Sequence, residues 1–316
     1  MGSVMQELLD QLQEHQCRGR IVSVRHVCDL SQEVERHRSR GLLGEEFYQE
    51  RLAWFDFRPP DSLPGAASLI VLAVPRPQTR VIFNWNGHAR ALIIPPTYVA
   101  YDRVRRQMQD LLTGFLAPKG YRVDRTALPL KLLAAHSGLV EYGRNNVTYI
   151  PGGTSFHQLV AFYSDLPCQE DTWQEAQMMA SCQNCHACIK HCPTNAIPSD
   201  RFLLRAERCI VFHNEKAGGI PFPAWMDLSW HNCLVGCMHC QRVCPQNRDV
   251  LDWVEESAEF SQEETTLLLA GTPLDQLDAE TVKKLERLDL VESLDTLPRN
   301  LGVFFGARRD DTVMAT

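Results

Sequence analysis

The sequence of 316 residues contains 44% apolar and 22% charged residues, a composition typical of a globular protein with two or three domains. Its formal charge of −7 is unevenly distributed, because residues 249–295 carry 14 acidic and 3 basic side chains and the rest of the chain is about +4. This distribution leaves room for an anionic ligand near the middle of the chain. It makes no nucleic-acid-binding surface by itself, so DNA is not an expected partner.

The pattern of apolar residues predicts neither membrane insertion nor export. No apolar run approaches the roughly 18 residues that suggest a membrane-spanning helix, so no membrane partner is expected. Residues 1–16 lack the apolar core of a secretion signal. A reducing cytoplasm also suits thiolate ligands, and we therefore expect a cytoplasmic protein.

Residues 1–172 predict an α+β domain. Met5, Leu8 and Leu12 recur at the spacing of an amphipathic N-terminal helix. The apolar run at 68–74 is typical of a strand buried on both faces, and Asn86-Gly87 between two apolar segments predicts a β-hairpin. The other expected elements are strands at 21–24, 121–124 and 156–163, helices over 104–115 and 128–137, and a polar loop over 142–153.

Residues 173–250 carry the clearest chemical signal. Residues 182–193 read CQNCHACIKHCP and match the C-x2-C-x2-C-x3-C-P run of bacterial ferredoxins, in which the fourth cysteine ligates the other of two [4Fe–4S] clusters. Residues 237–245 read CMHCQRVCP and end in the same way, but Leu234 stands where a further cysteine would complete the second run. This segment therefore predicts a ferredoxin-like module with two [4Fe–4S] clusters.

If the last cysteine of each run binds the cluster of the other run, the ligands divide into two sets. The first set is Cys182, Cys185, Cys188 and Cys244. The second set is Cys192, Cys237, Cys240 and one further thiolate, for which Cys209 and Cys233 are the two candidates. We prefer Cys209, which follows a predicted helix with enough chain to fold back, because Cys233 departs from the ferredoxin spacing; Cys233 stays open as the alternative.

Zinc and disulfides are the competing interpretations of these cysteines. The interval from Cys192 to Cys237 is long for a zinc ribbon, and Cys-Pro endings are typical of cluster binding. The intervening histidines are expected to be neutral surface side chains, since imidazole ligands would give two clusters too many ligands; they are His186, His191 and His239.

Residues 251–316 are expected to form an acidic helical extension. Val282, Leu285, Leu288, Val291 and Leu294 predict a C-terminal helix whose apolar side covers the core and whose acidic side faces solvent.

Several motifs resemble the epoxyqueuosine reductase family over roughly residues 60–305. In the first half they are Val123-Asp124, Lys131, the stretch 133–139 and the turn Tyr142-Gly-Arg-Asn145; in the second half they are the stretch 192–197, Arg208-Cys209, the phrase 236–245 and residues 297–301. This sequence departs from the family at Leu130, at Val140-Glu141, in the hairpin at 84–96 and in lacking a C-terminal helical repeat.

The resemblance implies a nitroreductase-like cobalamin-binding domain followed by the two-cluster module. It implies an iron–sulfur, cobalamin-dependent reductase in which the nearer cluster reduces a base-off cobalamin, with a small-molecule or tRNA-borne substrate and an external low-potential electron donor. Asp124 would match the family's proton donor, although an aspartate after a strand is also a common turn or cap residue. The residues expected to lie by the corrin are Lys131, Tyr142, Gly143, Arg144, Asn145 and Asn146.

An alternative function is that of a non-catalytic electron-transfer protein that reduces a partner, possibly a corrinoid protein. The enzyme predicts a wide apolar pocket over the loop of residues 142–146 that faces the nearer cluster. The electron-transfer protein predicts that side chains fill this space.

Overall fold

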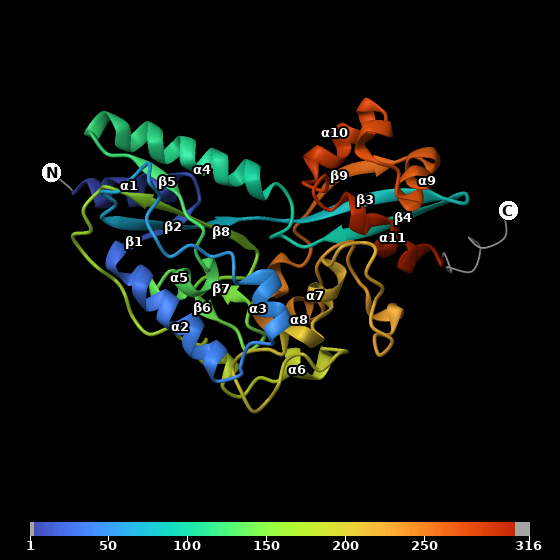
Figure 1. The fold of residues 1–316 in the computed structure, drawn as a ribbon, viewed down its shortest axis with the longest axis horizontal. Helices are drawn as coiled ribbons and strands as arrows, with labels where there is room; N and C mark the ends of the chain where they lie inside the picture. The colour runs from blue at the N-terminus through green and yellow to red at the C-terminus, as the bar shows by residue number, and fades with distance from the viewer. Residues whose placement is uncertain (1–2, 307–316) are drawn as a thin grey trace.

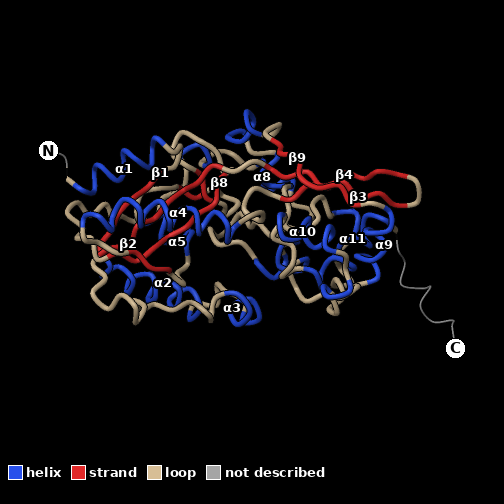
Figure 2. The backbone as a smooth tube through the Cα atoms, turned by 90° about the horizontal axis from the view of Figure 1, so that it is seen from above, coloured by secondary structure: helices blue, strands red, loops and turns tan. Residues whose placement is uncertain are grey.

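The computed structural model describes residues 3–306 and contains two β-sheets at opposite ends of the long axis (Figure 2). The first sheet has the strand order β1-β2-β8-β5, and each neighbouring pair is antiparallel. Its strands are β1 (Arg18–Ser23), β2 (Ser68–Pro75), β8 (His157–Ser164) and β5 (Val123–Arg125).

Helices cover both faces of this first sheet (Figure 1). Ile70 and Leu72 of β2 pack with α1 (Val4–Glu14) and α4 (Tyr101–Leu116), whereas Leu69 and Val71 pack with α2 (Val27–Ser39) and α5 (Leu130–His136). Successive side chains of a strand point to opposite faces, so a central strand between two helical layers must be apolar throughout. The continuous apolar run at 68–74 thus forms the central strand that its sequence predicted.

The second sheet combines the predicted hairpin with a strand from the C-terminal region. β3 (Gln78–Trp85) and β4 (His88–Ile94) form the hairpin around Asn86-Gly87, and both turn residues have positive φ. β9 (Val254–Phe260) pairs in parallel with β3 on the other side. Phe83 and Phe260 stack with ring centroids 4.8 Å apart and join the two segments in one core.

Helices from the end of the chain cover this second sheet. They are α9 (Gln262–Ala270), α10 (Ala279–Arg287) and α11 (Leu297–Phe305). The helix expected through Leu294 ends at Arg287, because Asp289 adopts a left-handed φ of 54° that no α-helix can continue. The sequence led us to expect helices alone after residue 250, and β9 is an addition to that expectation.

The cysteine-rich segment lies between the two sheets, on one side of the molecule (Figure 1). It consists of loops and short helices, namely α6 (Ala187–His191), α7 (Ile210–Asn214) and α8 (His239–Arg242). A small hairpin of β6 (Glu141–Tyr142) and β7 (Thr148–Tyr149) reaches toward it from the first sheet's domain, and α3 (Glu45–Arg51) lies nearby. Part of the loop predicted at 142–153 is therefore a two-stranded ribbon. The division at residues 172/173 and 250/251 stays a prediction.

No helix among residues 3–306 is long and apolar enough to cross a membrane.

Candidate metal centres and the hollow beside them

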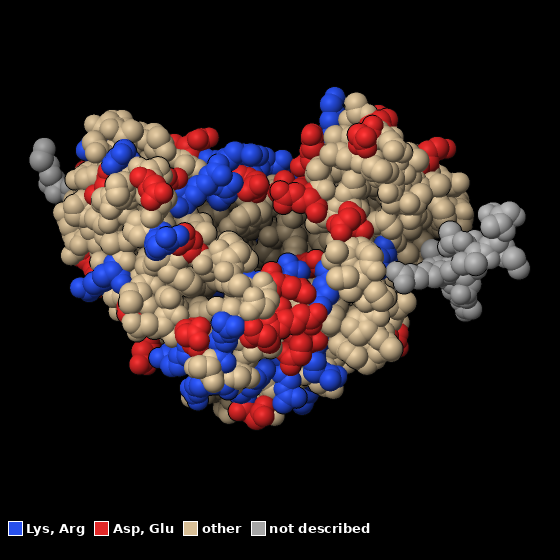
Figure 3. Space-filling model, in the orientation of Figure 1, with Lys and Arg blue, Asp and Glu red and all other residues tan. Residues whose placement is uncertain are grey.

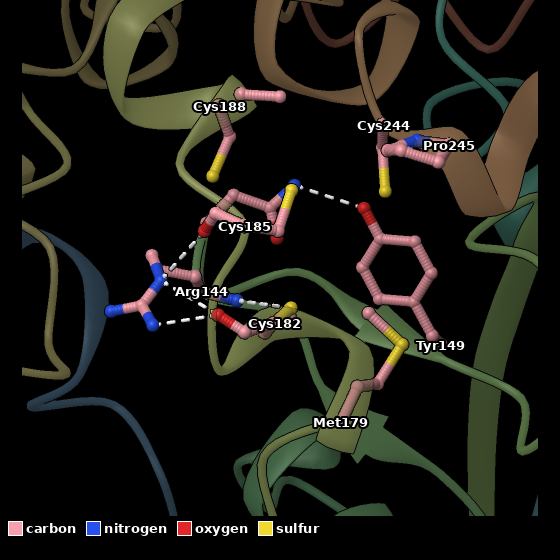
Figure 4. Close-up of a pocket in the computed structure, with 11 residues that line it drawn as sticks. Arg144, Tyr149, Met179, Cys182, Cys185, Cys188, Cys244 and Pro245 are labelled. Atoms are coloured by element: carbon pink, nitrogen blue, oxygen red, sulfur yellow. Dashed lines mark hydrogen bonds between the residues drawn. The ribbon is translucent and has the colours of Figure 1, made fainter.

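The structure gathers Cys182, Cys185, Cys188 and Cys244 around one small cavity. Figure 4 shows three of these thiols projecting from the turn before α6 and from α6 itself, while Cys244 enters from the opposite side. Four thiols from two distant segments around one space are the donor set that a [4Fe–4S] cluster takes. The arrangement fits such a cluster and agrees with the predicted exchange of Cys244 between the runs.

The other four predicted ligands also lie together. Burial and then the charges of Cys209 and Cys192 raise the pKa of Cys240, and after burial Cys240 and Cys209 similarly raise the pKa of Cys237. These mutual interactions place Cys192, Cys209, Cys237 and Cys240 in one neighbourhood. The assignment to a second cluster stays a prediction, and the arrangement supports it.

Cys209 and Cys233 occupy contrasting environments. Cys209 is the residue that precedes α7, and its pKa, raised to about 11, responds to burial and then to Cys192. Cys233 is 1% exposed and packs in an apolar group with Phe156 and Met238. Cys233 also helps to raise the pKa of Cys237, so both thiols lie near the second set. The apolar packing of Cys233 favours Cys209 as the fourth ligand, and this choice stays a prediction.

Arg144 holds the turn that carries the first cysteines. Its backbone N–H donates to Cys182 Sγ (3.4 Å), and its guanidinium donates to the carbonyls of Cys182 (2.7 Å) and Cys185 (3.2 Å). Hydrogen bonds from a charged donor contribute about 1.5–3 kcal/mol each. Arg144 therefore fixes the backbone of the first thiolate set. Its side chain lies there, and it is not among the lining residues of the larger hollow described below.

The neighbouring residues of this turn make different contacts. Tyr142 is buried with its ring edge against Phe202, and Asn145 is buried with its amide donating to Tyr149 Oη (3.0 Å). Gly143 has no room for a side chain, because a Cβ there would lie 2.4 Å from Asn145 Oδ1. Asn146, at a left-handed φ of 59°, offers its carbonyl to Lys131 Nζ (3.4 Å).

A hollow opens in the middle of the molecule, where α3, α7 and the segment after α10 meet (Figures 1 and 3). Its cavity volume is about 330 Å³, at the lower end of the usual range of about 300–1,000 Å³ for ligand sites. Arg51, Tyr98, Glu215 and Asp289 are among its lining residues. The hollow is therefore charged, and none of its lining residues belongs to the turn at 142–146, where a wide apolar pocket was expected.

Three ionisable groups connect this hollow to the second thiolate set. Burial raises the pKa of Tyr98, and the charges of Glu215 and Cys209 add to that effect. Burial also lowers the pKa of Lys131, although the charges of Cys209, Cys240 and Glu215 oppose the change. Lys131 is nevertheless exposed to solvent, where its ammonium group donates to the Asn146 carbonyl.

Within the described part of the chain, the Glu215 carboxyl has partners for one of its two oxygens only. Burial raises its pKa, while Tyr98 and Arg51, which contacts Glu215 Oε2 at 3.5 Å, oppose the change. Glu215 Oε1 is buried and has no hydrogen-bond partner within residues 3–306. A buried acceptor without a partner costs about 1–3 kcal/mol, so a bound group with N–H or O–H donors would stabilise this arrangement. The amide-bearing rim of a corrin supplies such donors.

Asp124 lies on the edge strand β5. Its carboxylate accepts hydrogen bonds from Ser62 Oγ and from the backbone N–H of Arg125 (2.7 Å). A capping aspartate makes contacts of this kind, which is the alternative role considered from the sequence.

The three histidines between the cysteines make the contacts expected of non-ligands. His191 Nδ1 pairs with the Ala187 carbonyl (2.9 Å), His239 Nε2 pairs with the Trp230 carbonyl (2.8 Å), and His186 is exposed.

Sequence reasoning missed Tyr98, Glu215, Arg51 and Tyr149. No motif marks the first three, which come from separate segments and meet only in the folded chain. Tyr149 lay in a segment that was expected to be a loop. The only sequence signal for its position beside the predicted ligand Cys244 was the nearby Gly143–Asn145 turn.

Comparison with known proteins identifies the cysteine-rich segment. Residues 181–247 match the family described as a 4Fe-4S double cluster binding domain. The chain therefore carries an iron–sulfur double-cluster domain, as its cysteine spacing predicted.

Curated relatives extend the similarity into the first domain. The chain is 27% identical to an epoxyqueuosine reductase of Staphylococcus aureus over 70% of this chain and 58% of that protein. It is 29% identical to the Vibrio cholerae enzyme over 66% and 57%, and 34% identical to the Xanthomonas campestris enzyme over 46% and 41%. The chain thus spans less than two thirds of the length of these relatives.

Solved structures show the same fold. Epoxyqueuosine reductase from Bacillus subtilis, in a form whose catalytic aspartate loop is swung out of the active site, matches with a TM-score of 0.67 and 22% identity over 95% of this chain and 81% of that one. A crystal structure of epoxyqueuosine reductase with a modified tRNA-Tyr stem loop matches with a TM-score of 0.64 and 20% identity over the same shares. The predicted resemblance is confirmed: the chain is similar in sequence to epoxyqueuosine reductases and shares their fold.

Proposed function

We propose that this divergent relative of the epoxyqueuosine reductases is an iron–sulfur reductase that passes electrons through two [4Fe–4S] clusters toward a base-off cobalamin in the central hollow. The observation that carries the proposal is the hollow itself, whose lining residues Tyr98 and Glu215 lie close enough to Cys209 and Lys131 to feel their charges. An external low-potential donor would reduce the first cluster, and the second would deliver electrons to the hollow. The reducing cytoplasm suits this chemistry.

The residues around the hollow have distinct parts in this proposal. Glu215 Oε1, which lacks a protein partner, would accept a hydrogen bond from an amide of the corrin, and Lys131 and the Asn146 carbonyl would border the same group. Bound there, cobalamin would supply the reductive bond-cleaving chemistry that side chains cannot perform. We also propose that the first domain has a nitroreductase-like fold.

The relatives also support a proposal for the substrate. A tRNA stem loop is bound in one structure of the same fold, so we propose a tRNA-borne epoxide as the first substrate to examine. Removal of an epoxide oxygen as water requires two electrons and two protons. We propose Asp124 as one proton source, and it would have to leave Ser62 to act.

The test combines an epoxyqueuosine-containing tRNA stem loop, a chemical reductant and the anaerobically reconstituted protein with cobalamin. Formation of the deoxygenated nucleoside is expected, with Asp124→Asn losing at least tenfold in rate while still binding cobalamin. Ser62→Ala is the matched control, because it removes the partner of Asp124 and leaves the carboxyl. Unchanged turnover in Asp124→Asn would refute the proton-donor role, and no turnover on any epoxide would refute the substrate.

A further inference from the structure

Asn145 and Tyr149 form a buried hydrogen-bonded pair between the two thiolate sets. They are 3% and 0% exposed, and Asn145 Nδ2 donates to Tyr149 Oη at 3.0 Å. Figure 4 shows the Tyr149 hydroxyl directed toward the Cys244 sulfur while it receives this bond. Neither side chain reaches the central hollow's lining, so their function is to be sought at the cysteines.

Each end of the pair contacts a thiolate of a different set. The Tyr149 hydroxyl is directed toward the Cys244 sulfur of the first set, and Cys244 helps to raise the pKa of Tyr149. The Asn145 amide lies close enough to Cys240 of the second set to act on the pKa of that thiol. A primary amide has two N–H donors and a phenol has one O–H donor. One donor is therefore available for each of the three contacts, Asn145 to Cys240, Asn145 to Tyr149 and Tyr149 to Cys244.

The surrounding backbone holds the pair in place. Asn145 Oδ1 accepts from the Val147 N–H (3.2 Å), and the Gly143 N–H donates to the Val147 carbonyl (2.8 Å). Only glycine fits at 143, since a Cβ would lie 2.4 Å from Asn145 Oδ1 and 2.5 Å from the Tyr149 ring. The backbone of this turn thus holds the amide and the phenol in place.

We propose that Asn145 and Tyr149 are positioning residues that bridge the two clusters and set their reduction potentials. A hydrogen bond to a ligating sulfur stabilises the reduced cluster, which carries more negative charge, and so raises its potential. The bridge applies this effect to one ligand of each cluster at once. The inference rests on the cluster ligands of the proposed function, but not on cobalamin or on any substrate.

The test is an anaerobic redox titration of the reconstituted full chain, followed by electron paramagnetic resonance. Tyr149→Phe keeps the ring and removes the donor to Cys244, and we expect the potential of one cluster to fall. A tenfold change in the ratio of reduced to oxidised cluster corresponds to 59 mV for a one-electron couple, and we expect a shift of that order. Asn145→Leu removes the donor to Cys240 and the support of Tyr149, so both potentials should fall.

Tyr163→Phe is the matched control, because Tyr163 is equally buried in the first sheet and its hydroxyl has no hydrogen-bond partner within residues 3–306. Its potentials should equal those of the unaltered protein. Unchanged potentials in Tyr149→Phe with full iron content would overturn the proposal, because a merely structural role would alter stability alone.

A second measurement uses the unaltered protein and so does not depend on variants that keep their iron. Deuterium exchange of the unaltered protein should leave a buried, slowly exchanging proton coupled to one cluster in an electron–nuclear double resonance spectrum. Absence of such a proton would also overturn the bridge. Iron content reports separately on the cluster assignment, so failure of the proposed function and failure of the bridge give different results.

Discussion

Replacement of Cys209 by Ala, with Cys233→Ala as its partner, tests the ligand set of the second cluster. Cys209 lies among Cys192, Cys237 and Cys240, so its loss removes one of four thiolates. Iron should then fall from about eight atoms per chain toward about four.

Cys233 should behave quite differently, because it lies against Phe156 and Met238 in an apolar group. Its truncation leaves a cavity of roughly one buried heavy atom, comparable with the loss of one methyl group, which costs about 0.5–1.5 kcal/mol. The melting temperature should decrease while iron content stays at about eight atoms per chain.

The assay is iron and sulfide analysis after anaerobic reconstitution, with thermal melting measured on the same samples. The ligand assignment would be refuted if Cys233→Ala lost half of its iron and Cys209→Ala kept all of it. Equal loss in both variants would show that the assay reports folding and would also refute the distinction.

Three further predictions concern packing, pH and the cluster turn. Gly218→Ala should lower the melting temperature strongly, because the new Cβ would lie 1.7 Å from the Asp295 carbonyl oxygen. Gly219→Ala is the control, since its Cβ meets nothing within 4 Å and its melting temperature should not change. Equal melting temperatures in the two variants would contradict this packing. Burial lowers the pKa of His157 to about 4, so the unfolded chain, at about 6.5, binds a proton that the folded chain excludes. Unfolding by urea should therefore become easier by about 2 kcal/mol between pH 7 and pH 5, and His157→Gln should remove that dependence if the reasoning holds. Arg144→Lys should lower iron content by losing the forked contacts to carbonyls of the first cysteine run, which a single ammonium cannot reproduce, and full iron loading in this variant would count against the role of the guanidinium.

Much of the fold could be predicted because its signals are local. The Asn86-Gly87 turn specifies its hairpin within a few residues, and the run at 68–74 reports two buried faces through its composition alone. Strand β9 could not be predicted in the same way. Its sequence, VEESAEF, is acidic and only weakly alternating, and its partner β3 lies more than 170 residues earlier in the chain. Pairing of this kind depends on the assembled core, which no local pattern encodes.

The candidate site shows the same limit. Cysteine spacing predicted the iron–sulfur domain, because most ligands of a cluster recur at short fixed intervals within one run. The residues of the turn at 142–146 were assigned to a cofactor from resemblance, yet Arg144 and Asn145 face the thiolates and their neighbour Asn146 faces Lys131. Side-chain direction within a tight turn depends on backbone angles, which sequence similarity at this level does not fix.

The most direct test of the central claim is electron transfer from the clusters to cobalamin in the hollow. The reconstituted protein, reduced with dithionite and freed of excess reductant, is mixed anaerobically with cobalamin, and the spectra of cluster and corrin are followed together. We expect one bound cobalamin per chain to be reduced as the clusters are reoxidised, and Ser293→Trp, which places a large ring in the hollow lined by Ser293, to abolish both changes. Clusters that stay reduced in the presence of cobalamin, or equal transfer in Ser293→Trp, would contradict the account and favour an electron-transfer protein without a corrin.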